Sequence, residues 1–157
     1  MSDIAIEEFQ PQHFEQALRI LHESNCLHAQ NDPQQFLCAP ESNSIPYLQC
    51  ILSHPDNFGY VALDGSKVVG LLCAGELVRD ENIYVNRKYY QIFDIVVSSS
   101  HQKRGIGKKL ISRLAEEAKT DGIKQIELEV FSFNNNAVAF YRHLNFRETS
   151  RNMSLYL

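Results

Sequence analysis

The spacing of apolar side chains changes several times along this chain, and each change predicts a new element. Residues 3–9 alternate between apolar and polar side chains, which predicts a strand. From Pro11 the apolar positions recur at helical spacing, and the proline is well placed to begin a helix. Residues 25–43 have no regular period and predict a loop or a broken helix. Residues 47–52 predict a short helix that ends before Pro55, because proline disfavours helical backbone in the residue before it.

The middle of the chain predicts strands. Segments 58–63 and 67–78 flank Asp64–Gly65, a strong signal for a hairpin turn, and the aromatic and β-branched residues over 89–97 predict a third strand. The elements expected after it are a helix whose buried stripe runs from Ile106 to Ala118, a strand over 125–131, a helix over about 135–144 and a strand over 147–157. This order of elements predicts an α/β domain with a mixed sheet.

Length and composition predict a single domain over residues 1–157. A chain of 157 residues with 44% hydrophobic and 22% charged residues has the composition of a globular domain rather than a disordered one. The longest uncharged apolar run, 68–75, is far shorter than the ~20 residues of a membrane span, and the acidic N-terminus lacks the apolar core of a signal peptide. The net charge of -4 argues against a generic nucleic-acid binder. We therefore expect a cytoplasmic protein with neither membrane nor nucleic-acid partners.

The cysteines and histidines do not have the spacing of a known metal site. Cys26, Cys38, Cys50 and Cys73 include no CxxC pair, and we expect four reduced thiols. The 6 histidines show no HExxH or other paired spacing, which argues against a bound metal ion.

Candidate chemistry first appears in the segment Gln102-Lys103-Arg104-Gly105-Ile106-Gly107, which lies between a predicted strand and a predicted helix. Glycines allow the backbone to approach a ligand closely, and the free N–H groups of a first helical turn bind anions. Several basic residues near this helix start favour a highly charged ligand such as a pyrophosphate. The alternative is a glycine turn with a solvated basic face. Neither a GxxxxGK[ST] motif nor GxGxxG is present, since Leu110 stands where the last glycine would be.

A second informative segment runs from Asn134 to Tyr141. Asparagine is a good helix N-cap, the small side chain of Ala137 allows close packing, and Tyr141 lies one turn further along the same helix face. Asn145 stands where a left-handed helix C-cap is expected. The alternative is an ordinary capped helix with Tyr141 in the core.

Together the two segments resemble the GNAT superfamily of acetyl-CoA-dependent N-acetyltransferases. The signature [Q/R]-x-x-G-x-[G/A] matches Gln102, Gly105 and Gly107. The second signature, N-x-x-A-x-x-[FL]-Y followed by x-x-x-G-F, is matched by Asn134, Ala137, Phe140, Tyr141 and Phe146, with Asn145 in place of glycine. The resemblance implies a mixed, mostly antiparallel sheet of six to seven strands flanked by about four helices, with a splay between strands four and five.

The same resemblance implies where acetyl-CoA binds. The pantetheine arm would pair with the backbone of the strand that ends at Val97, and the loop amides would hold the pyrophosphate. The residues implied to contact the cofactor are Ile95, Val96, Val97, Gln102, Lys103, Arg104, Gly105, Ile106, Gly107, Lys108, Asn134, Asn136, Ala137 and Tyr141. Many family members have glycine where this chain has Lys103.

The reaction implied is direct attack of a neutral amine on the thioester. Tyr141 matches the family's general acid for the departing thiolate. Histone-type members have a glutamate at the position of Gln91, so Asp94, the one carboxylate of that strand, is the candidate base. Because side chains alternate along a strand, Gln91 and Asp94 should face opposite sides unless a bulge intervenes. A structural role for Asp94, such as a hydrogen bond to a loop, is one alternative, and Glu76, Glu129, a water-mediated base or no base at all are others.

The acceptor is the least constrained feature. Residues 25–43 commonly line the acceptor pocket in this family, so His28 and Phe36, together with Tyr84, are candidate substrate contacts. A primary amine on a small molecule is favoured, and a protein or peptide amine is the alternative. A non-catalytic acyl-CoA-binding module and a nucleotide-binding regulator are further alternatives. By analogy with the family, a homodimer involving the C-terminal strand (Met153 to Leu157) is also possible.

Overall fold

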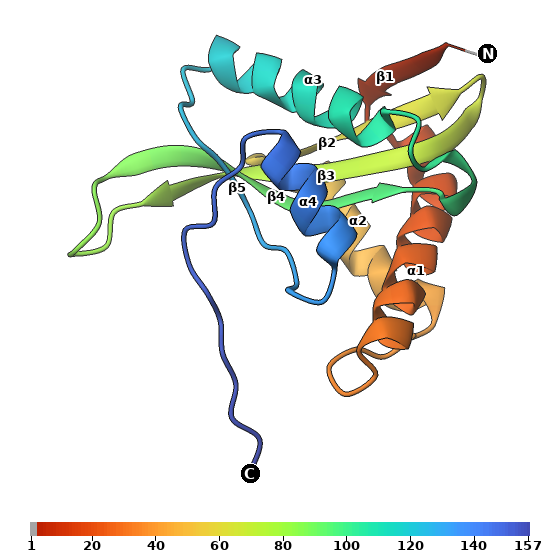
Figure 1. Ribbon diagram of the computed structural model, residues 1–157. Coiled ribbons are helices and arrows are strands. Elements are labelled where there is room, and N and C mark those ends of the chain that lie inside the picture. The colour runs from red at the N-terminus through yellow and green to blue at the C-terminus, as the bar shows by residue number, and fades with distance from the viewer. Residues whose placement is uncertain (1–2) are drawn as a thin grey trace.

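A computed structural model describes residues 3–157, and residues 1 and 2 of the predicted domain lie outside the described residues. Its centre is a sheet in the order β1-β2-β3-β4-β5, in which the first four strands pair antiparallel and β4 pairs parallel with β5 (Figure 1). The strands are β1 (Ile4–Glu8), β2 (Asn57–Asp64), β3 (Lys67–Arg79), β4 (Arg87–Val97) and β5 (Ile126–Leu128).

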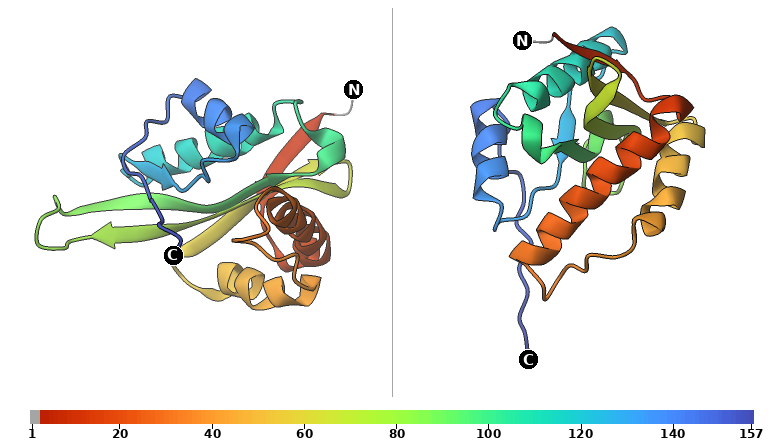
Figure 2. Two further views of the ribbon diagram at one scale, coloured as in Figure 1. Left: turned by 60° about the horizontal axis from the view of Figure 1, so that its bottom comes forward. Right: turned by 90° about the vertical axis from the view of Figure 1, so that its right-hand side faces the viewer.

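Helices cover both faces of this sheet. The helices are α1 (Phe14–Asn31), α2 (Ile45–Ser53), α3 (Ile106–Thr120) and α4 (Asn135–His143), with 3-10 turns η1 (Pro11–His13), η2 (Glu41–Ser44) and η3 (Ser99–His101). In Figure 2, α1 and α2 lie on one side of the sheet, and α3 and α4 lie on the other. Apolar side chains such as Leu48 and Leu71 form a core on the first side, and others such as Leu72 and Leu110 form a second core on the opposite side. The α/β class and the mixed sheet are therefore as predicted.

The C-terminal strand predicted over 147–157 is wrong, and the sheet of the described residues has five strands rather than six or seven. The segment leaves the sheet, and Met153 and Leu155 are 89% and 85% exposed. Apolar alternation is not sufficient for a strand, because a strand also needs a neighbour with which to pair. Elsewhere, α1 extends through residues 25–31, where a loop or broken helix was predicted, and β5 is shorter than predicted.

The prediction of four reduced thiols is also wrong. Cys26 on α1 and Cys38 in the following loop form a disulfide, while Cys50 and Cys73 are free. The chain turns back after Asn31, and this return brings two cysteines that are 12 positions apart in sequence into contact. Among residues 3–157, no helix has both the length and the apolar composition that crossing a bilayer requires.

The hairpin of β3 and β4 extends beyond the helices (Figure 2). Its end carries Tyr84, whose ring lies 5.0 Å from the guanidinium of Arg79. The strand from Arg87 to Asp94 spans roughly 23 Å, which separates this end from the middle of the sheet. Ile83 and Val85 beside Tyr84 are 88% and 80% exposed.

Candidate active site

The sheet opens between β4 and β5. The two strands pair only from Tyr90 with Ile126 to Ile92 with Leu128. β5 ends at Leu128, whereas β4 continues to Val97. On this side the backbone of residues 93–97 therefore has no strand partner within the described chain. The opening corresponds to the predicted splay, and it leaves hydrogen-bonding groups available to a ligand.

A β-bulge at Phe93 determines the direction of the side chains in the opening. Cys73 pairs with Asp94 and Ala74 pairs with Ile92, so that Phe93 is the additional residue in β4. Cys73 and Gly75 are two positions apart on β3 and therefore lie on the same face of the sheet. Their partners on β4 are Asp94 and Gln91, so these two residues share that face as well. The bulge thus brings Gln91 and Asp94 to the same side of the sheet, whereas strict alternation along β4 would place them on opposite sides.

Asp94 lies at the centre of the candidate site. The Tyr47 hydroxyl on α2 donates a 2.6 Å hydrogen bond to Asp94 Oδ2. Burial raises the pKa of the Asp94 carboxyl, while the Tyr47 hydrogen bond and the nearby His28 lower it. The net pKa is raised, which makes the carboxylate a stronger base than an exposed aspartate. Tyr47 gave no signal in the sequence, since it lies in a short amphipathic helix 47 positions from its partner.

Tyr141 on α4 is partly buried against the core cluster that includes Ile92 of β4. Burial, followed by the negative charge of Asp94, raises the pKa of the Tyr141 phenol to about 12. The ring packs edge to face against Phe146, with 5.7 Å between the centroids. A phenol with this pKa stays protonated at neutral pH, so Tyr141 is a proton donor rather than a base. Tyr141 is therefore close enough for the Asp94 charge to act on its phenol.

The loop before α3 has the backbone that its glycines predict. Gly105 is the N-cap of α3 with φ of 77°, and Lys103 is also left-handed with φ of 61°. The left-handed region favours glycine, which gives a physical reason why family members have glycine at the position of Lys103. No side chain caps the first turn of α3. Its unpaired N–H groups, with the positive end of the helix dipole, form a candidate anion site at the end of β4.

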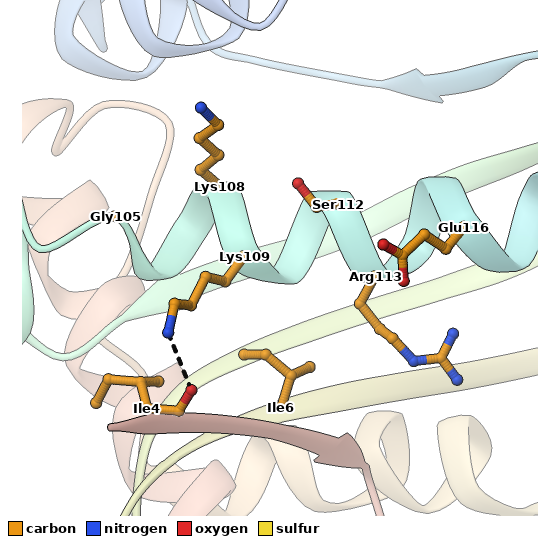
Figure 3. Close-up of a pocket in the computed structure, with 8 residues that line it drawn as sticks. All are labelled: Ile4, Ile6, Gly105, Lys108, Lys109, Ser112, Arg113 and Glu116. Atoms are coloured by element: carbon orange, nitrogen blue, oxygen red, sulfur yellow. Dashed lines mark hydrogen bonds between the residues drawn. The ribbon is translucent and has the colours of Figure 1, made fainter. Parts of the chain in front are cut away.

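The basic residues around this turn point in different directions. Arg104 lies 3.8 Å from the carboxylate of Asp64, and Lys109 Nζ donates to the carbonyl oxygen of Ile4 at 3.2 Å. Lys108 is exposed and projects away from β1 (Figure 3). Lys103 is exposed as well. Figure 3 also shows a groove between β1 and α3, lined by Ile4, Ile6 and the outer face of α3, which does not include the opening between β4 and β5.

Contacts between α3 and α4 join the two sequence signatures. A Cβ on Gly107 would lie 3.0 Å from the ring of Phe140, so glycine lets α4 pack on the first turn of α3. Asn134 Oδ1 accepts a 3.1 Å hydrogen bond from the N–H of Ala137, and it therefore caps α4 as predicted. Asn145 is left-handed with φ of 67°, as predicted. Asn136 is exposed on the first turn of α4.

An aromatic cluster lies at the end of α1. The rings of His28 and Phe36 are 5.5 Å apart, and the Phe36 ring lies 4.7 Å from that of Phe131. Phe133 stacks on Phe131 at 5.8 Å. His28 and Phe36 were predicted substrate contacts, and the structure brings their rings together, with His28 close enough to Asp94 to lower the pKa of that carboxyl. Phe131 and Phe133 were missed, because they follow the short β5 and only the fold turns them towards α1. Tyr84 lies away from this cluster, at the end of the β3–β4 hairpin.

The other carboxylates considered as bases have different surroundings from Asp94. Glu76 forms a 2.6 Å ion pair with Lys88, and Glu129 is exposed. The Gln91 side chain donates to the carbonyl oxygen of its neighbour Ile92 at 3.1 Å. His101 lies 3.3 Å from Asp64 near the anion site. Among the described carboxylates considered for this role, Asp94 alone combines burial with a position at the opening.

The chain belongs to the acetyltransferase (GNAT) family, whose sequence model matches residues 7–146. This family uses acetyl-CoA. Over 92 residues the chain is 32% identical to "Probable N-acetyltransferase family 8 member 5" of Mus musculus, a match that covers 59% of this chain and 39% of that protein. The chain thus spans about two fifths of the length of this curated relative.

Two solved structures share the fold. A variant of the BH1408 protein of Bacillus halodurans superposes with a TM-score of 0.92 at 22% identity, covering 98% of this chain and 99% of that one. Aminoglycoside N-acetyltransferase AAC(6')-Iy, in complex with CoA, superposes with a TM-score of 0.74 at 18% identity, covering 100% and 96%. At such identities the structures establish a common fold.

Proposed function

We propose that this protein transfers an acetyl group from acetyl-CoA to a primary amine, with both substrates bound together. The observation that carries the proposal is the end of β4–β5 pairing at Ile92 and Leu128, which leaves the last part of β4 without a strand partner. An extended pantetheine arm pairs with the backbone of Ile95 to Val97 as an additional strand would. The shared fold of a CoA complex supports this placement.

The anion site at α3 supports the binding of the cofactor's pyrophosphate. The first turn of α3, which begins after Gly105 and has no side-chain cap, leaves backbone N–H groups free at a helix N-terminus, where a negatively charged group is stabilised. The exposed side chains of Lys103 and Lys108 add positive charge. Asn136 and Ala137, at the start of α4, border the arm from the other side. Because most of these contacts are made by backbone, substitution of single loop side chains is tolerated.

Tyr141 and Asp94 supply the proton transfers. The amine nitrogen attacks the thioester carbonyl carbon, a C–N bond forms, and the C–S bond then breaks. The Tyr141 hydroxyl donates a proton to the departing CoA sulfur, consistent with its protonated state at neutral pH. The Asp94 carboxylate receives the proton that the amine loses, and its raised pKa suits it to that task. Proton exchange with solvent restores both groups.

A small amine is the acceptor that the surroundings favour. The negative charge of Asp94 attracts a cationic amine, and the ring cluster with His28 and Phe36 provides an apolar and cation-binding wall beside it. The structural neighbour that acts on aminoglycosides supports the same class, since aminoglycosides are small molecules with several amines. Tyr84 is left out of this acceptor site because the fold places it far along the β3–β4 hairpin.

Thiol release from acetyl-CoA, measured against a panel of polyamines, aminoglycosides and N-terminal peptides, tests the proposal. We expect turnover with one acceptor class, and at least tenfold lower kcat in Tyr141→Phe, which corresponds to about 1.4 kcal/mol of barrier. The KM for acetyl-CoA should change little in this variant. Binding of acetyl-CoA without turnover of any acceptor would favour the acyl-CoA-binding module. Absence of acetyl-CoA binding would contradict the proposal.

A further inference from the structure

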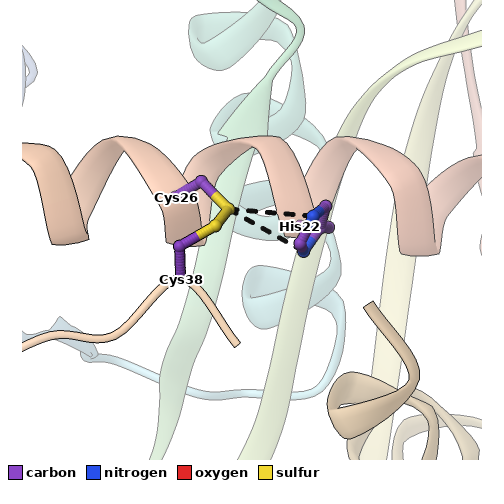
Figure 4. Close-up of side chains that lie close together, drawn as sticks. All are labelled: His22, Cys26 and Cys38. Atoms are coloured by element: carbon purple, nitrogen blue, oxygen red, sulfur yellow. Dashed lines mark hydrogen bonds between the residues drawn. A yellow bond between two sulfur atoms is a disulfide. The ribbon is translucent and has the colours of Figure 1, made fainter. Parts of the chain in front are cut away.

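His22, Cys26 and Cys38 lie together where the loop after α1 returns to this helix, and none of the three is assigned a part in acetyl transfer. His22 and Cys26 are four positions apart on one helix, so their side chains project from the same face, and the loop after α1 brings Cys38 against them (Figure 4). One potential ligand atom from each of the three residues lies within 4.8 Å of the others. The set of one imidazole and two thiols is characteristic of Zn²⁺ sites.

The separations agree with this chemistry. With Zn–S near 2.3 Å and Zn–N near 2.0 Å, tetrahedral geometry places a sulfur and a nitrogen ligand about 3.5 Å apart. His22 Nε2 lies 3.7 Å from Cys26 Sγ. The Cα atoms of Cys26 and Cys38 are 4.4 Å apart, which lets both sulfurs approach one point. His22 and Cys26 are half-buried and Cys38 is exposed, so an ion can enter from solvent.

We propose that His22, Cys26 and Cys38 bind one Zn²⁺ ion when the Cys26–Cys38 disulfide is reduced. Reduction adds two electrons and two protons to the disulfide, and two molecules of a low-molecular-weight thiol supply them as they join in a disulfide of their own. Zn²⁺ then displaces the two thiol protons, and three protein ligands leave a fourth position for water. Disulfide and metal ion are therefore alternative states of one site.

The disulfide-bonded form and the Zn²⁺-bound form both attach the loop that carries Cys38 to α1. Cys38 lies two positions after Phe36, and the Phe36 ring contacts Phe131 across the end of α1. Either the disulfide or the metal ion ties this loop to α1, whereas the reduced, metal-free protein has neither tie. The proposal does not depend on acetyl transfer, and its test measures metal binding directly.

The test uses the full chain reduced with a phosphine, freed of the reductant without oxygen, and titrated with Co²⁺ and then Zn²⁺. We expect one equivalent of Co²⁺ with thiolate charge-transfer absorption, and displacement of that ion by Zn²⁺. Cys26→Ser, Cys38→Ser and His22→Ala should each bind at least tenfold more weakly. The matched control is Cys50→Ser, since Cys50 is an exposed free cysteine on α2, and it should bind as the wild type does.

Three results would overturn the proposal. They are absence of metal binding by the reduced wild type, equal binding by the disulfide-bonded protein, and equal binding by the Cys26→Ser or Cys38→Ser variant. A second measurement on the wild type guards against misfolded variants. Zn²⁺ should slow alkylation of Cys26 and Cys38 at least tenfold and leave alkylation of Cys50 unchanged, and equal slowing of Cys50 would also contradict a specific site.

Discussion

The Tyr47 hydroxyl and the Asp94 carboxylate are joined by a 2.6 Å hydrogen bond that connects α2 to the bulged part of β4. Tyr47 donates this bond, and the bond opposes the effect of burial on the pKa of Asp94. The Tyr47 phenol stays protonated, because burial and the Asp94 charge raise its pKa far above the ordinary value. Tyr47 is therefore positioned to determine how basic Asp94 is.

Removal of this hydrogen bond should change the pH dependence of the reaction. In Tyr47→Phe the pKa of Asp94 rises further, so the carboxylate form is lost at a higher pH. The acidic limb of the kcat/KM profile should move to higher pH, with kcat/KM about tenfold lower at the acidic end, because a hydrogen bond to a charged group is worth about 1.5–3 kcal/mol. Profiles of both proteins with one acceptor check this, and an unshifted limb would show that Asp94 is not the titrating group.

Asp94 should also cost folding stability at neutral pH. Its pKa is raised in the folded protein, so folding favours the protonated carboxyl, and the destabilisation is fully felt above the folded-state pKa. Asp94→Asn keeps an acceptor for Tyr47 and removes the buried charge. We expect the variant to melt at a higher temperature than wild type at pH 7 while losing acetyl transfer. The difference should shrink as the pH falls towards the unfolded pKa of about 3.9, and melting curves across this range measure it.

The left-handed backbone at Gly105 should matter both for stability and for the cofactor. No heavy atom lies within 4 Å of the position that a Cβ would take, so Gly105→Ala adds backbone strain of about 1 kcal/mol without a clash. Gly122 lies beyond the other end of α3, a helix roughly 22 Å long, and has the same open surroundings and a similar φ of 72°. Gly122→Ala is thus a matched control. Both variants should lose similar stability, but Gly105→Ala alone should bind acetyl-CoA more weakly by calorimetry.

Two adjacent lysines should differ in their effect on acetyl-CoA. Lys108 projects into solvent, whereas Lys109 is bound to the Ile4 carbonyl and lies 3.5 Å from the Asp3 carboxylate. Lys108→Ala should weaken acetyl-CoA binding about three- to fivefold at low salt, and the loss should diminish as ionic strength rises. Lys109→Ala should leave the dissociation constant unchanged. Equal losses in the two variants would indicate a diffuse charge effect rather than a contact of Lys108.

Local backbone features were predictable from the sequence, whereas long-range contacts were not. The left-handed conformation of Asn145 and the cap formed by Asn134 depend on residues within one turn, and the sequence motifs identified both. The disulfide between Cys26 and Cys38 was missed because it depends on how far α1 extends before the chain returns.

The face of the sheet on which the Asp94 side chain lies was likewise not predictable from the sequence of β4 alone. The bulge at Phe93 arises in pairing with β3, where Gly75 leaves room for the Phe93 ring, 2.8 Å from the position of an added Cβ. Alternation within β4 alone assigns Asp94 and Gln91 to opposite faces. The presence of a carboxylate in the strand was therefore predictable, but the face that it occupies required the neighbouring strand.

The brief pairing of β5, which has 3 residues in the sheet, has a consequence for the lifetime of the protein. A ligand that lies along β4 would link this strand to the C-terminal part of the chain, and a bound ligand at a hundred times its dissociation constant adds about 2.7 kcal/mol to folding stability. As the concentration of acetyl-CoA rises, hydrogen exchange in β5 and α4 would become slower and resistance to proteases would increase. The supply of acetyl donor would thereby control how long the enzyme persists as well as how fast it turns over.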